Sequence, residues 1–373
     1  MTEIKAEIKN KFYKSIFNHY GKENYDEYRF GKFPDRFKNR HSAIKLLKDK
    51  YRKAIGFKNS ITENNFNQAY EIIAPYEEGL QKIYENLSDQ SKYTIIEVLA
   101  YHMLGFEKVK LSFNTKEYHQ AVEKMNRLKS SDDYITSNFN SNKQYKFDLN
   151  AIGYNVQLYF NAIGVVTDFI AEQYAYKESG KAIVEVEEGD IVFDIGACWG
   201  DTAHYFASKA GESGKVHSFE FIPGNIELFQ KNLSLNSRFK EVINIVEHPV
   251  SDTSDVEVYF KDNGPGSIMK MEPFKDQTGL VKTISIDDFV EKNQLGKVDF
   301  IKMDIEGAEP LALKGAINTI KKFRPKLAIA NYHGLDDFTN IPNWILDLDL
   351  GYEIFIGHYT MHAEETVCFA KPK

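Results

Sequence analysis

Short apolar runs alternate with helical stretches along the second half of the chain, and this alternation constrains the fold more than any other feature. The runs are typical of strands, and they lie at Asp190–Ile195, Lys215–Glu220, Val242–Val246, Val298–Asp304 and Lys326–Asn331. Helical stretches separate several of them, at 200–210, 223–234 and 309–321. Because alternating strands and helices form a parallel sheet with right-handed crossovers, we expect an α/β fold. Two last strands, Tyr352–Gly357 and Glu365–Ala370, predict an antiparallel hairpin at the end of this sheet.

The first part of the chain has a helical pattern instead. Apolar residues recur three and four positions apart, which favours helices with one buried face, at Ile4, Ile8, Phe12 and Ile16 and again at Ile44, Leu47, Tyr51 and Ile55. The stretch 130–146 is rich in Ser, Asn, Asp and Lys, which is typical of a boundary. We therefore predict a mainly helical N-terminal domain over 1–145, for acceptor binding or oligomerisation, and a second domain over 146–373.

Charge is distributed unevenly between the two parts. Residues 1–150 carry 26 basic and 20 acidic side chains, a net of +6, whereas residues 151–373 carry 21 and 34, a net of −13. The stretch Arg29–Lys58 holds 11 Lys or Arg against Asp35 and Asp49, with aromatic residues between them. Three interpretations stay open for this stretch: a solvated helix face, a surface for an anionic acceptor, or an interface between copies of the chain.

Several classes of protein are excluded by composition. Apolar residues make up 42% of the 373 residues, which suits a globular chain with a real core. Cys198 and Cys368 are too few for a disulfide framework or a zinc site, and we expect a reduced, cytoplasmic chain. The start of the chain lacks the apolar core of a signal peptide. Residues 149–167 carry no charge but are too polar to span a membrane, so we expect no transmembrane segment.

A Gly-rich turn follows the first strand of the predicted sheet, in IVFDIGACWGDTAHYFA. Asp194 ends the strand, and Gly196 and Gly200 precede a helix. Ligands of open α/β sheets bind at the carboxyl ends of strands, and an acid there suits a cationic ligand better than a pyrophosphate. S-Adenosylmethionine, with its ammonium and nucleoside ends, fits this description. Glu220 ends the second strand 26 residues later, where a carboxylate can accept bonds from both ribose hydroxyls.

More acids and a histidine follow the later strands. VDFIKMDIEGAEP places Asp304, Glu306 and Glu309 at the end of the fourth strand, and Glu309 is expected to serve the N-terminus of the next helix. Asp304 and Glu306 are expected near the reacting group, to hold a hydroxyl, act as a base or bind Mg²⁺. His333 follows the fifth strand and is the expected base. His358 and His362, after the next strand, are alternatives.

Together these segments resemble the FkbM family of S-adenosylmethionine-dependent methyltransferases over residues 150–373, and DIEGAE is the most specific of them. The resemblance implies a class I methyltransferase fold, a Rossmann-like seven-stranded sheet whose last strand is antiparallel. It also implies O-methylation, commonly of sugar hydroxyls in glycans or glycosylated metabolites. The site residues that we expect are, for the cofactor, Asp194, Gly196, Ala197, Gly200, Thr202, Glu220, Val250 and Ser251 and, for catalysis, His333, Asp304 and Glu306. Gly266 and Ser267 resemble a further motif near the active site, and metal dependence stays open.

Other functions remain to be weighed against a sugar O-methyltransferase. A methyltransferase acting on an RNA ribose would use the basic N-terminal region to hold the nucleic acid. The sequence DIEG, in place of a Pro-Pro-aromatic element, argues against methylation of a base amine. A nicotinamide oxidoreductase is disfavoured by the glycine spacing and by the acid at the first strand's tip. A protein that binds the cofactor without transfer is disfavoured because Asp194, Glu220 and Asp304 are all present with His333.

Overall fold

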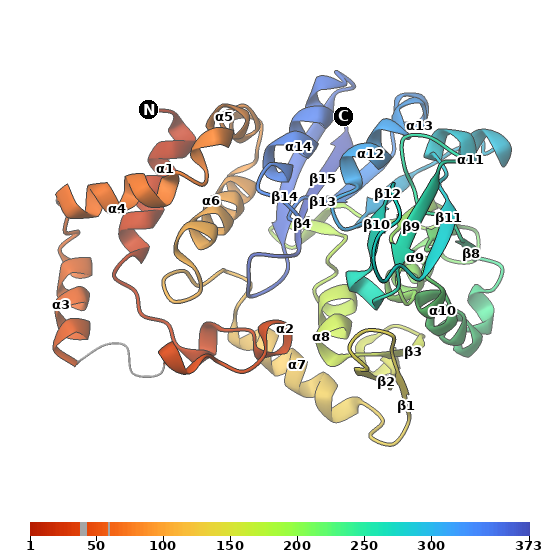
Figure 1. The fold of residues 1–373 in the computed structure, drawn as a ribbon, viewed down its shortest axis with the longest axis horizontal. Coiled ribbons are helices and arrows are strands. Elements are labelled where there is room, and N and C mark those ends of the chain that lie inside the picture. The colour runs from red at the N-terminus through yellow and green to blue at the C-terminus, as the bar shows by residue number, and fades with distance from the viewer. Residues whose placement is uncertain (38–42, 59) are drawn as a thin grey trace. The chain divides into compact units, whose positions relative to one another are not determined.

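The computed structural model describes residues 1–37, 43–58 and 60–373 (Figure 1). They divide into two compact units. The first comprises Met1–His119, Asn331–Asp347 and Ile354–Thr366, and the second comprises Gln120–Ala330, Leu348–Glu353 and Val367–Lys373. The domain boundary expected at 145/146 stays a prediction.

The first unit is mainly helical. Its helices are α1 (Glu3–Ser15), α2 (Glu27–Phe30), α3 (Ala43–Ala54), α4 (Ser60–Tyr70), α5 (Glu77–Glu85), α6 (Asp89–Leu104) and α14 (Asp337–Asp347), and α7 (Lys116–Leu128) continues into the second unit. The predicted apolar stripe of α1 is confirmed at Ile4, Ile8 and Phe12, which are buried, whereas Ile16 follows the end of the helix and is half-buried. The Ile44–Ile55 pattern also forms a helix, α3, but its apolar residues are exposed.

Segments from near the end of the sequence complete the first unit. Helix α14 contacts α5, and Leu87 forms a parallel bridge with Ile354. The Ile356 N–H donates to Ser91 Oγ at 3.0 Å. These bonds tie strand β14 (Tyr352–His358) to the start of α6, so the helical part of the chain depends on sequence more than 200 residues away.

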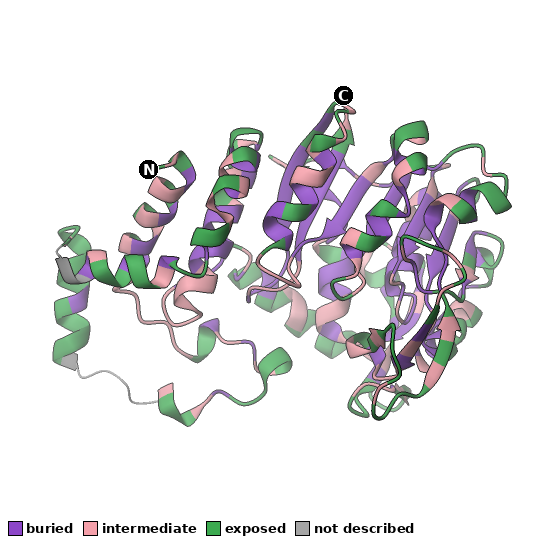
Figure 2. Ribbon diagram, turned by 45° about the horizontal axis from the view of Figure 1, so that its top comes forward, coloured by how far each residue is buried: buried purple, intermediate pink, exposed green. Residues whose placement is uncertain are grey.

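A seven-stranded sheet forms the core of the α/β part, and its strands are coloured as buried in Figure 2. The strand order is β14 (Tyr352–His358), β15 (Thr366–Pro372), β13 (Lys326–Ala330), β12 (Phe300–Met303), β6 (Ile191–Ile195), β7 (Lys215–Phe219) and β8 (Ile243–Val246). The pairs from β13 to β8 are parallel, whereas β15 runs antiparallel to β13. The predicted α/β fold with an antiparallel last strand is thereby confirmed.

Helices connect the parallel strands. The predicted ones are present as α9 (Asp201–Ala210), α10 (Pro223–Leu235), and α12 (Glu309–Lys314) with α13 (Ile317–Phe323), whereas α11 (Ile286–Lys292) is not among the predicted helices. Between β8 and α11 the chain forms a separate antiparallel sheet of β9 (Glu257–Lys261), β10 (Ile268–Lys270) and β11 (Gly279–Lys282). A short hairpin of β4 (Tyr176–Glu178) and β5 (Lys181–Val184) lies ahead of β6 in the chain.

The prediction of helix up to about residue 145 is wrong at its end. Strands β1 (Tyr134–Thr136), β2 (Lys143–Asp148) and β3 (Gln157–Phe160) form a three-stranded antiparallel sheet. The polar residues that suggested a boundary make the turn between β1 and β2, where Asn140 and Ser141 take φ of 50° and 53°. Residues with short polar side chains tolerate this conformation best, which explains the composition of the stretch.

The uncharged stretch 149–167 is buried protein in part. It contains β3, α8 (Ala162–Val165) and several fully buried side chains, whereas Asn150 and Gly153 are exposed. Among the described residues, no helix has the length and apolar character needed to cross a membrane.

The predicted helix 309–321 is broken into α12 and α13 at Gly315. A Cβ on Gly315 would lie 2.2 Å from the carbonyl oxygen of Ser251, so the backbone of this turn lies directly against the segment that follows β8. Glycine is required here by the close approach of two backbones.

We expect Gly315→Ala to destabilise the protein by about 1–3 kcal/mol, because the added methyl group meets a backbone oxygen that cannot move independently. Urea unfolding measures this change. The matched control is Gly296→Ala, because a Cβ at Gly296 would meet no atom within 4 Å. Equal stability of the two variants would contradict the close approach.

Candidate active site

The Gly-rich turn connects β6 to α9, and two of its positions can hold only glycine. Gly196 has φ of +83°, and a Cβ there would lie 1.9 Å from the carbonyl oxygen of Asp304. Gly200 has φ of +80° and packs against the Phe229 ring, which a Cβ would approach within 2.1 Å. The backbone N–H groups of Gly196 and Ala197 both donate to the carbonyl of Phe219. The turn is therefore fixed against β7, α10 and the end of β12.

Asp194 lies at the end of β6 and is fully buried. Its carboxylate accepts hydrogen bonds from Thr202 Oγ1 at 3.0 and 2.9 Å, which joins β6 to the first turn of α9. Lys302 Nζ lies 3.2 Å from Asp194 Oδ1. Asp194 thus holds the Gly-rich turn in place through its contacts with Thr202 and Lys302, and a direct contact with a cofactor stays a prediction.

Lys302 is the buried cation of this site. It lies in β12, opposite Asp194 in the register, and is 1% exposed. Its ammonium group donates to the carbonyls of Ile195 at 3.2 Å and Gly196 at 2.7 Å. Burial alone lowers the pKa of Lys302, but attraction by Asp194, Asp304 and Asp201 outweighs it and raises the pKa above its usual value. Lys302 therefore stays charged.

Asp304 follows β12 and is half-buried. Tyr174 donates its hydroxyl hydrogen to Asp304 Oδ2 at 2.8 Å, and the Lys302 ammonium lies 5.2 Å from the centre of the same Tyr174 ring. Tyr174 thus bridges a buried cation and a carboxylate. The arrangement orients Asp304 at the carboxyl end of the central strand, where a bound ligand is expected.

Glu306 and Glu309 have different environments. Glu306 is exposed on the turn after Asp304, with φ of 58°. Glu309 is fully buried, accepts a hydrogen bond from the Ile305 N–H at 2.7 Å, and offers an oxygen within 4.8 Å of one on Asp304. Glu309 thereby closes the turn ahead of α12, as expected for an acid at a helix start. Glu309, and not Glu306, is therefore the acid whose carboxylate lies near that of Asp304, and Mg²⁺ binding by Asp304 and Glu306 stays a prediction.

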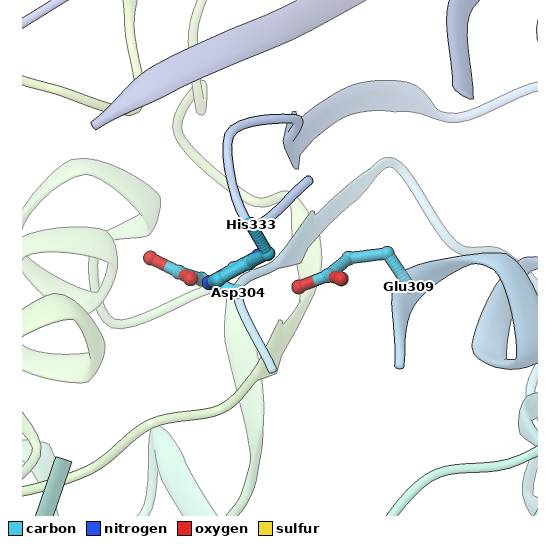
Figure 3. Close-up of side chains that lie close together, drawn as sticks. All are labelled: Asp304, Glu309 and His333. Carbon is cyan, nitrogen blue, oxygen red and sulfur yellow. The ribbon is translucent and has the colours of Figure 1, made fainter. Parts of the chain in front are cut away.

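Figure 3 shows Asp304 and Glu309, from the second unit, together with His333. His333 belongs to the first unit and follows the end of β13 by three residues, in a stretch where its ring lies 4.3 Å from that of Tyr332. Asn331 is fully buried, and both polar atoms of its amide lack a hydrogen-bond partner within the part of the chain that the structure describes. A buried amide in this state is satisfied by an ordered water or by a bound group.

The alternative histidines have partners in the protein. His358 Nδ1 lies 2.9 Å from Thr366 Oγ1, and burial lowers its pKa to about 3. His362 Nε2 lies 3.5 Å from Asp26 Oδ2, and burial again lowers the pKa. Both contacts join parts of the first unit to each other.

Glu220 follows β7 and is 6% exposed. Its Oε1 accepts from the N–H groups of Phe221 at 2.7 Å and Ile222 at 2.8 Å, and Oε2 accepts from Asn225 Nδ2 at 3.2 Å. Burial raises its pKa to about 7, although these hydrogen bonds oppose the shift. These hydrogen bonds orient the carboxyl group at the end of β7. Because its pKa is about 7, a further hydrogen-bond donor would favour the ionised carboxylate near neutral pH.

The remaining predicted cofactor residues follow β8. Val250 is buried and pairs with Ile284 in a parallel bridge, and the Ser251 N–H donates to the Ile284 carbonyl at 3.0 Å.

Gly266 and Ser267 lie after Gly264 in a helical turn, where Ser267 Oγ donates to the Gly264 carbonyl at 2.7 Å. Burial raises the pKa of the Cys198 thiol, which keeps the thiol protonated.

Comparison with known proteins adds the chemical class. Residues 194–354 match the model of the methyltransferase FkbM domain. This segment is an FkbM methyltransferase domain. The structure is similar to that of the methyltransferase FkbM from Methylobacillus flagellatus KT, with a TM-score of 0.52, 19% identity, and coverage of 89% of this chain and 72% of that chain. The hexuronic acid methyltransferase AglP from Haloferax volcanii is 25% identical over 170 residues, which cover 46% of this chain and 67% of AglP.

Three residues around the FkbM domain's site were not identified from the sequence: Lys302, Tyr174 and Asn225. Lys302 carries a usable signal, because a lysine inside an otherwise apolar parallel strand must be buried and paired. Asn225 links Glu220 to the turn, since its Oδ1 also accepts from the Trp199 indole N–H at 3.1 Å. Tyr174 precedes the sheet in the chain, and nothing local indicates its contact with Asp304.

We expect Lys302→Met to destabilise the FkbM domain by about 3–5 kcal/mol, because it leaves Asp194 buried without its partner. Chemical unfolding measures the loss. The control is Lys297→Met, which removes the same charge from a lysine that is 53% exposed beside Asp299. Adding Asp194→Asn to Lys302→Met should recover part of the lost stability, and a double variant no more stable than Lys302→Met would argue against the pairing.

Proposed function

We propose that this protein is an S-adenosylmethionine-dependent O-methyltransferase whose acceptor is a hydroxyl group of a sugar in a glycan or a glycosylated metabolite. The observation that carries the proposal is the charge balance at the carboxyl ends of β6, β7 and β12. Asp194 and Asp304 lie at these ends together with Glu220, whose pKa of about 7 leaves it partly ionised at neutral pH, and Lys302 offsets one of these acids. Such an environment favours a cation.

The residues present fit this cofactor. The buried acids suit its sulfonium and ammonium charges, the Gly196 turn offers closely packed backbone, and Glu220 can accept bonds from ribose hydroxyls. The orphaned amide of Asn331 provides a further donor and acceptor after β13. When bound, the cofactor supplies an electrophilic methyl group on a positively charged sulfur. The protein's own contribution is to hold the acceptor in line and to remove its proton.

A sugar acceptor is supported by the relative AglP, which acts on a hexuronic acid. The alternative is an RNA ribose, since both acceptors are carbohydrate hydroxyls. AglP favours the first, and the FkbM domain itself does not distinguish the two.

His333 is our proposed base. It follows β13 at the carboxyl edge of the sheet, the edge at which Asp194 and Asp304 end their strands. An imidazole has a pKa suited to taking a proton from a hydroxyl near neutral pH. If His333 takes the proton, Asp304, which Tyr174 orients, is a second polar group that can bind the acceptor hydroxyl. Glu306 lies on the exposed turn that follows Asp304.

The experiment that tests the function is transfer of tritiated methyl groups to glycans that contain hexuronic acids, with RNA as the second acceptor. We expect sugar labelling, and His333→Ala should reduce turnover tenfold or more with S-adenosylhomocysteine affinity nearly unchanged. His248→Ala is the control, because His248 is an exposed histidine whose Nδ1–H donates to the Lys282 carbonyl at 2.9 Å. RNA labelling without sugar labelling would overturn the acceptor, and loss of cofactor affinity would overturn the role of His333.

The raised pKa of Glu220 predicts how cofactor affinity depends on pH. Ribose hydroxyls donate to the ionised carboxylate, whereas the free protein holds a proton there below pH 7, since the pKa is about 7. We therefore expect S-adenosylhomocysteine to bind about tenfold more tightly at pH 8 than at pH 6. Calorimetric titration of Glu220→Gln, which cannot ionise, supplies the control for other titrating groups. An equally steep pH dependence in that variant would contradict the ribose assignment.

A further inference from the structure

Helix α3 presents an apolar stripe to solvent. Ile44, Leu47, Tyr51 and Ile55 are 67%, 67%, 66% and 53% exposed, and α3 is coloured as exposed over most of its length in Figure 2. At about 100° per residue these positions fall within an arc of about 80° on one face of the helix. The stripe includes Ile55, whose N–H still bonds to the Tyr51 carbonyl at 3.1 Å. Large apolar residues gathered in this way mark an interaction surface.

The opposite face of α3 attaches the helix to the first unit, and its contacts are polar. Asp49 is 6% exposed and lies 2.9 Å from His19 Nε2. Lys53 donates to Asn18 Oδ1. A surface helix of a globular protein normally buries its apolar face and exposes its polar one. In α3 the polar face is the buried one and the apolar face is exposed, so the apolar stripe does not contribute to the core of this unit.

The positive charge of α3 indicates the kind of surface to which the helix would bind. Its twelve residues hold five Lys or Arg against Asp49, a formal charge of +4. Lys48 and Arg52 lie beside the stripe on one side and Lys50 on the other, and all three are exposed. A helix with basic residues flanking large apolar ones is typical of segments that lie flat on anionic membranes.

We propose that α3 binds the surface of an anionic lipid bilayer, with Ile44, Leu47 and Tyr51 inserted between the lipid headgroups. Two copies of this helix would meet with like charges, which disfavours self-association through the stripe. A nucleic acid would satisfy the basic residues but would leave the apolar stripe in water. Residues 38–42, which belong to the basic stretch 29–58, lie outside the described residues, and the proposal depends on α3 alone.

Flotation of the full-length protein with lipid vesicles tests this proposal. We expect at least tenfold more protein on vesicles that contain phosphatidylglycerol than on pure phosphatidylcholine, and less at high salt. Leu47→Glu should reduce binding to the anionic vesicles by tenfold or more, and Tyr51→Gln should also reduce it. The matched control is Leu128→Glu, the same change at a leucine that is 44% exposed in α7.

Each outcome decides the question. Because Leu47 is 67% exposed, its variant should keep the wild-type melting temperature, and loss of lipid binding with an unchanged Tm supports the proposal. Equal binding to both kinds of vesicle, or no effect of Leu47→Glu, would overturn it. Light scattering that shows a wild-type dimer and a Leu47→Glu monomer would assign the stripe to a second copy of the chain instead. RNA binding that depends on Leu47 would assign it to a nucleic acid.

Discussion

The buried ion pair between Lys302 and Asp194 is the interaction on which the site depends. The two residues stand opposite each other on the central strands β12 and β6, with Nζ and Oδ1 3.2 Å apart. A charge so deep in a sheet is tolerated only when it is paired and its other hydrogens are used. The carbonyls of Ile195 and Gly196 take those hydrogens, so the same ammonium group also fixes the path of the Gly-rich turn. The close approach of Gly196 to the Asp304 carbonyl follows from this arrangement.

Much of the α/β architecture could be predicted from the sequence because it depends on local pattern. The apolar runs that end in Asp194, Glu220 and Asp304 mark strands and their carboxyl ends together, and parallel topology then places all three acids at one edge. Contacts made over a long distance in the chain could not be predicted in this way. Tyr174 reaches Asp304 from 130 residues away, and Gly315 breaks a regular helical pattern because of the backbone at Ser251.

The acids after β12 show a second limit of sequence reasoning. Glu306 and Glu309 are three residues apart and chemically alike, yet one is exposed and the other fully buried. The difference comes from the backbone: φ of 58° at Glu306 and 94° at Gly307 reverses the chain, so that Glu309 returns to accept the Ile305 N–H. Side-chain chemistry alone cannot distinguish the two positions. Likewise, the spacing of Ile44, Leu47 and Tyr51 predicts a helix but not which way its apolar side is turned.

The division of the chain also affects the order in which the protein can fold. The mainly helical unit takes Asn331–Asp347 and Ile354–Thr366 from near the end of the sequence, and its α6 bonds to Ile356. During synthesis the ribosome produces α1 to α6 long before these segments exist. Completion of the helical unit must then wait for almost the whole chain, and the surfaces that its late segments cover are exposed meanwhile. Such a nascent chain is a natural client for a chaperone, although each of its helices has ordinary local sequence signals.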